Sequence, residues 1–113
     1  MRKRIRQILF DLGIPFKLNG FKYLEDALVC IIEVDEKSFI KVCEYVGEEY
    51  FGSRERIYGA ISVAVKKADR NSDAWKKYVK LDITSPTDIV YAIAFNIMKE
   101  IEDEQDISAR NCK

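Results

Sequence analysis

Apolar residues recur at intervals of three and four along most of the 113-residue chain, a spacing that predicts helices and no strands. The first apolar stripe ends at Gly13-Ile14-Pro15, a natural stop signal for a helix. A second predicted helix spans about Phe21–Val34, after an expected turn at Asn19-Gly20. A third, short helix is predicted from Phe39.

The fourth predicted helix follows a turn at residues 50–52, and Ser53 is its expected N-cap. Its apolar stripe consists largely of small residues: Ile57, Ala60, Ile61, Ala64, Val65 and Ala68. Small side chains allow two helices to approach closely. We therefore expect Ala60 and Ala64 to be buried against the third helix.

The last two predicted helices complete an all-α fold. The fifth spans Ser72–Leu81 and is anchored by Trp75, and the sixth begins at Ser85-Pro86, with proline in its first turn. The sequence thus predicts one compact six-helix domain over residues 1–113, with an acidic tail that frays from about residue 103. The third and fourth helices form a candidate helix-turn-helix.

Composition excludes several classes of function. The chain has no histidine, no CxxC and no glycine-rich phosphate loop, so we expect no enzyme, metal, cofactor or small-molecule substrate. Three cysteines cannot all pair within one chain, and Cys30 and Cys43 fall in apolar stripes as expected free thiols. No apolar run is long enough for a membrane span, and the basic N-terminus lacks a signal-peptide core. These features favour a cytoplasmic protein.

Charge is unevenly distributed although the net charge is zero. Four basic residues lie within the first six, and they could grip phosphate or form an ordinary solvated terminus. Basic residues predominate again over residues 54–80, where phosphate contact and solvation are both open. Glu44, Glu48 and Glu49 place negative charge beside the fourth helix and count against DNA binding there.

One stretch carries a resemblance to a known family. Gly13-Ile14-Pro15, Gly20-Phe21 and Tyr23-Leu24 with Ala27 follow the pattern G-[IV]-P, G-[YF] and Y-L-x-x-A. This pattern resembles the start of the C-terminal effector domain of the stage-zero sporulation response regulator family. The similarity continues through residues 41–42, 57–64 and 86–87, and so covers nearly the whole chain.

The resemblance implies a DNA-binding transcriptional regulator. In that family the six-helix effector domain inserts its fourth helix into the major groove of double-stranded DNA, often as a tandem dimer. We therefore expect duplex DNA as the partner and self-association through the last helix. Family members carry a receiver domain before the effector domain, whereas these 113 residues contain none.

This chain departs from the family in the fourth helix itself. The family pattern R-V-E-R-A-I-R-H-A-I corresponds here to R-I-Y-G-A-I-S-V-A-V, from Arg56 to Val65. Tyr58 and Gly59 replace a glutamate-arginine pair, and Ser62 and Val63 replace an arginine-histidine pair. Since arginine to guanine is the commonest specific major-groove contact, the family's target sequence does not transfer.

We expect recognition to shift to the first turn of the fourth helix. Arg54 and Arg56 would meet bases or phosphates there, and Gly59 would let the DNA backbone approach closely. The full expected interface is Ser53, Arg54, Arg56, Tyr58, Gly59, Ser62 and Lys66. The alternative is a protein-interaction module that keeps the fold, has lost DNA binding and modulates a partner regulator.

Overall fold

The computed structural model describes residues 1–80, 82 and 84–111, with side chains described as far as residue 106. The described residues form six helices and no strands, so the expected compact all-helical architecture is confirmed. The helices are α1 (Arg2–Asp11), α2 (Asn19–Val34), α3 (Phe39–Tyr50), α4 (Arg54–Lys66), α5 (Asp73–Tyr78) and α6 (Pro86–Asn111). None of the described helices combines the length and apolar character needed to cross a membrane.

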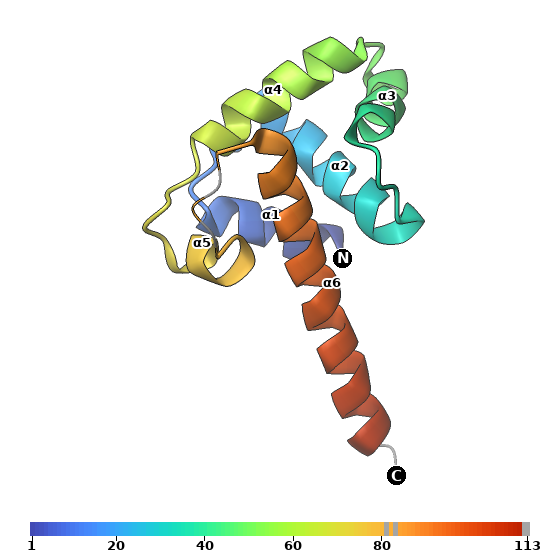
Figure 1. Ribbon diagram of the computed structural model, residues 1–113, viewed down its shortest axis with the longest axis vertical. Helices are drawn as coiled ribbons and strands as arrows, with labels where there is room; N and C mark the ends of the chain where they lie inside the picture. The colour runs from blue at the N-terminus through green and yellow to red at the C-terminus, as the bar shows by residue number, and fades with distance from the viewer. Residues whose placement is uncertain (81, 83, 112–113) are drawn as a thin grey trace.

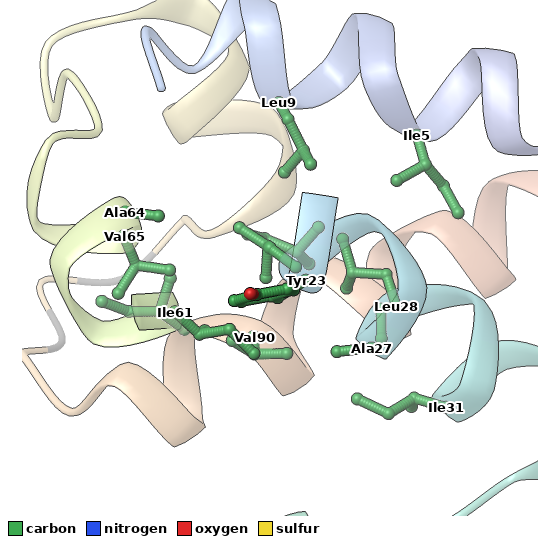
Figure 2. Packing of buried hydrophobic residues seen from close by; sticks show 14 of the residues in the cluster. Ile5, Leu9, Tyr23, Ala27, Leu28, Ile31, Ile61, Ala64, Val65 and Val90 are labelled. Carbon is green, nitrogen blue, oxygen red and sulfur yellow. The ribbon is translucent and has the colours of Figure 1, made fainter. Parts of the chain in front are cut away.

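The centre of the fold is α2, whose residues are buried almost all round from Gly20 to Ile31. It contacts α1, α3, α4 and α6 (Figure 1). Figure 2 shows Leu9 of α1, Tyr23 and Leu28 of α2 and Ile61 of α4 within one cluster of buried side chains. A helix that is apolar on most sides is stable only when other helices cover it. Since α2 contacts four helices, it is the scaffold against which the others pack.

Gly20 corrects two of the sequence predictions. Asn19 and Gly20 form the first turn of α2 instead of a separate turn. A Cβ at Gly20 would overlap the backbone carbonyl of Ala60 and crowd the methyl group of Ala64. The small residues of α4 thus pack closely against α2, not against α3 as expected. Ala64 is fully buried there, whereas Ala60 is only partly buried.

A second glycine fixes the connection between α3 and α4. Phe51 ends α3 in the left-handed conformation, with φ 55°, and the Gly52 N–H donates to the Gly47 carbonyl at 2.9 Å. A side chain at Gly47 would collide with the Gly52 carbonyl, so the connection folds directly onto α3. The connection spans residues 51–53 and leaves Phe51 96% exposed. This contact sets where α4 begins relative to α3.

The only tryptophan of the sequence anchors α5, as expected. Ser72 caps this helix, and Trp75 is 5% exposed, with the Arg70 guanidinium 4.6 Å from its ring centre. The helix is shorter than predicted because it ends at Tyr78, and Leu81 lies outside the described residues.

The last helix is longer than the sequence suggested. It continues without interruption to Asn111, so the tail expected to fray from about residue 103 lies within α6. Its C-terminal part extends beyond the rest of the fold (Figure 1). Arg4 pairs with Glu104 at 2.8 Å and ties part of this extension back to α1.

The N-terminal arginines, for which two roles were left open above, form ion pairs within the protein. Arg2 and Arg6 pair with Glu25 and Asp26, two buried acids of α2. The Tyr50 hydroxyl also donates to Asp26, and burial of the phenol, together with Asp26, raises the pKa of Tyr50. Buried acids require such partners because an unpaired charge in the interior is unstable. The basic start of the chain is therefore part of the fold.

Candidate functional site

The candidate site is the outward face of α4, which lies across one end of the molecule beside α3 (Figure 1). One side of this helix buries Ile57, Ile61, Ala64 and Val65 in the core. The opposite side is exposed and carries most of the residues expected to contact a partner. The helix is thus held firmly from behind while its outer face remains accessible.

The start of α4 is well defined. Ser53 has an extended backbone and caps the helix, and its Oγ accepts from the Arg56 N–H at 3.2 Å. This confirms the predicted N-cap and explains why Ser53 contributes structure at the site. Arg56 is exposed in the first turn, and its side chain makes no hydrogen bond or ion pair with any described residue.

Arg54, in contrast, is already engaged within the protein. Its guanidinium pairs with Glu44 of α3 at 2.9 Å and with Glu55 at 3.1 Å. The pKa of Glu55 is lowered, first by a hydrogen bond from its own backbone N–H and then by Arg54, so Glu55 stays ionised. Sequence alone placed Arg54 and Arg56 together as equivalent donors. The structure separates them into one arginine with two carboxylate partners and one without a partner among the described residues.

Tyr58 and Gly59 differ in their surroundings. The Tyr58 ring packs edge-on against Phe39 of α3, with ring centres 5.8 Å apart, and the residue remains 41% exposed. Gly59 is exposed, and a Cβ at this position would meet nothing within 4 Å. Packing within the chain therefore does not require a glycine here.

The end of the expected interface needs one correction. The Ser62 hydroxyl is buried and has no hydrogen-bond partner among the described residues, so it does not face outward as expected. The next residue, Val63, is 50% exposed. Lys66 is exposed in the last turn and, like Arg56, has no ion-pair partner in the described part of the chain.

A groove of about 430 Å³ lies beside the first turns of three helices. Its lining comes from α3, α4 and α6 and from the residue that caps α3: Ser38, Phe39, Ile40, Cys43, Arg54, Glu55, Tyr58 and Thr87. Burial raises the pKa of the Cys43 thiol to about 11, so this sulfur is neutral and unreactive at physiological pH. The groove thus offers an apolar surface with a charged rim.

Sequence reasoning missed both the groove and the pairing of Arg54. Glu44 and Arg54 are ten residues apart, across a turn, and no helical spacing relates them. The groove joins residues 38–43 to residue 87, a proximity that depends on where the start of α6 lies relative to α3 and α4. Neither feature has a signal in the periodicity of the chain.

No protein-family model, curated protein or solved structure matches this chain. Among the described residues, no group of three acids or cysteines is placed to hold a metal ion. The surface of α4 and its surroundings are therefore the basis of the proposed function.

Proposed function

We propose that this protein is a sequence-specific DNA-binding transcriptional regulator whose α4 enters the major groove as the second helix of a helix-turn-helix. The observation that supports this most is Arg56, an exposed arginine without a partner among the described residues, in the first turn of a capped, firmly packed helix. Recognition helices contact base edges mainly through their N-terminal residues. Arg56 also matches the arginine of the family that the sequence resembles.

Gly59 supports the same proposal. A glycine within a helix is about 1 kcal/mol less favourable than alanine. Since no described atom of the chain occupies the space beside Gly59, the fold gains nothing in return. A sugar–phosphate backbone passing close to α4 would use that space. Lys66 lies ten residues after Arg56, or about 15 Å along the helix, where it would contact a further phosphate.

The proposed contacts follow from these positions. Arg56 binds a base or a phosphate, Gly59 admits the DNA backbone, Tyr58 contacts a phosphate or a thymine methyl, and Lys66 binds phosphate. Ser53 holds the start of the helix. Ser62 is left out because its hydroxyl is buried.

Selection of bound sequences from a pool of random duplexes tests this function. We expect a preferred sequence to be enriched, and Arg56→Ala to weaken binding to it. If Arg56 binds a phosphate, its removal should also reduce the slope of log affinity against log salt by about 0.9. Wild-type protein that binds no duplex at low salt would rule out the proposal.

One observation favours the alternative, a domain that acts through a protein partner. The groove beside α4 exposes Ile40 and Tyr58, at 59% and 41% respectively, next to a charged rim formed by Arg54 and Glu55. Ile40→Lys distinguishes the two functions. It should preserve or strengthen duplex binding, because it adds positive charge, but should abolish docking of an apolar protein side chain.

We also propose self-association through α6. Phe95 is 64% exposed on this helix, and it lines a shallow depression with Met98, Lys99 and Glu102. Sedimentation of the wild type and of Phe95→Ser, each with and without duplex, tests this. Monomers under every condition would contradict it.

A further inference from the structure

Glu44 occupies an unusual position for an acid beside a DNA-binding helix. It is exposed on α3, yet its carboxylate reaches across the connection to the Arg54 guanidinium, 2.9 Å away. The Glu55 carboxylate contacts the Nε atom of the same Arg54 guanidinium. Two carboxylates thus hold one arginine, whereas Arg56, two residues further along the same turn, has neither.

We infer that Glu44 is a selectivity residue for the proposed DNA interface: it holds Arg54 so that duplex offering only phosphate recruits this arginine less than duplex with a correctly placed guanine. This inference rests on the proposed function. Under this inference Arg54 contacts DNA mainly where a guanine is correctly placed, whereas Arg56 contacts DNA of any sequence. Glu44 touches Arg54 and not the DNA, so it acts as a positioning residue.

The relative strengths of the competing contacts make this selection workable. An exposed ion pair is weak, and DNA can break it. A bidentate contact from arginine to guanine is among the strongest specific contacts in the major groove, whereas a phosphate contact is made on every sequence. Arg54 therefore leaves Glu44 when a guanine is correctly placed, and stays with Glu44 on arbitrary DNA.

Glu44 is better suited to this role than Glu55. Glu55 lies in the first turn of α4, where an acid also stabilises the helix N-terminus, so its removal would change the helix itself. Glu44 lies on a different helix, and its side chain makes its described contact with Arg54 alone. Substitution at residue 44 thus leaves Arg54 with Glu55 alone and keeps the first turn of α4 intact.

The test measures the affinity of full-length variants for two duplexes at one salt concentration: the selected sequence and a scrambled version of it. We expect Glu44→Ala to raise affinity for the scrambled duplex about two- to fivefold, and affinity for the selected duplex less. The ratio of the two affinities should therefore fall. Circular dichroism checks that each variant remains folded.

Glu48→Ala is the matched control. Glu48 is exposed one turn further along α3 and makes no ion pair among the described residues. Glu48→Ala therefore removes the same negative charge as Glu44→Ala but leaves the pair between Arg54 and Glu44 intact. Its effect on the scrambled duplex should be smaller. In an Arg54→Ala background, Glu44→Ala and Glu48→Ala should have the same effect, because no arginine remains to be released.

The outcomes separate this inference from the proposed function. If the wild type binds its selected duplex and Glu44→Ala behaves like Glu48→Ala, the selectivity role is wrong and the DNA-binding function stands. If the excess effect of Glu44→Ala persists without Arg54, Glu44 acts by repelling DNA and the inference is again wrong. If neither the wild type nor Glu44→Ala binds any duplex, both proposals fail.

Discussion

Two sets of arginines in this protein look alike in the sequence and behave differently in the structure. Arg2 and Arg6 of α1 pair with Glu25 and Asp26, which are 7% and 5% exposed. Arg54 of α4 pairs only with exposed glutamates, and Arg56 with no described residue. The arginines are exposed in both regions, so what distinguishes the regions is the burial of the acids.

This difference indicates what each set does. A buried acid depends on its partner, so α1 cannot release its arginines without exposing or destabilising α2. Breaking an exposed ion pair costs little free energy, so solvent or another anion can replace the partner. The arginines of α1 therefore hold the fold together, and those of α4 remain available to a ligand.

The largest expected effect comes from Asp26, on the buried side of the comparison. Asp26→Asn should lower the free energy of unfolding by about 2–3 kcal/mol, because Arg2 and Tyr50 both lose a charged acceptor. Glu44→Gln, which weakens the exposed pair with Arg54, should change stability by less than about 1 kcal/mol. Chemical denaturation followed by circular dichroism measures both. Similar losses in the two variants would remove the distinction between the regions.

The next effect concerns binding at α4. Arg56→Ala should weaken binding to the selected duplex about tenfold, within the range expected for one specific arginine contact. Its unfolding free energy should stay within about 0.5 kcal/mol of the wild type, because Arg56 has no described partner to lose. Arg6→Ala should show the opposite pattern, with lower stability and unchanged affinity once the protein is folded.

Gly59→Ala should move stability and binding in opposite directions. The added methyl group enters open space, so the helix should gain up to about 1 kcal/mol of stability. Duplex affinity should fall, because the same methyl group would lie between α4 and the DNA backbone. Lys66→Ala, with no such steric effect, serves as the comparison. Unchanged affinity in Gly59→Ala would show that nothing approaches α4 closely at this point.

The smallest expected effect is a dependence on acidic pH. Burial opposes the ionisation of Glu100, but hydrogen bonds from Tyr78 and Lys77, together with the charges of Lys77 and Arg4, outweigh it and lower the pKa of Glu100. A lowered pKa contributes stability above the ordinary glutamate value of 4.5, and this stability is lost as pH falls through the folded-state value. Glu100→Gln should therefore flatten the decline of stability below pH 4.5. Glu102→Gln, on the exposed side of α6, should leave that decline unchanged.

Local signals in the sequence were sufficient to predict the helices and several of their ends. Ser53 caps α4 as expected, because N-capping depends on residues within one turn. The prediction was wrong at Gly20, where an Asn-Gly pair that is typical of a turn instead lies in a helix. There the glycine is needed for the approach of α4, whose Ala60 is distant from it in the sequence.

The candidate site was less predictable than the fold for the same reason. The spacing of apolar residues identified the exposed face of α4 but placed Ser62 on it, because periodicity cannot show that a hydroxyl is covered by a neighbouring part of the fold. The partners of Arg54 and of the α1 arginines lie up to 100 residues away in the chain. Their pairing depends on how the helices cross, which local patterns do not encode.

The buried position of Trp75 provides an intrinsic optical probe. Because it is the only tryptophan and is covered within α5, its fluorescence should shift to longer wavelength when the domain unfolds. Trp75 lies in α5, outside the helix that carries the proposed DNA contacts. Emission from the unlabelled protein can therefore report whether a variant is folded during the same titration that measures its binding.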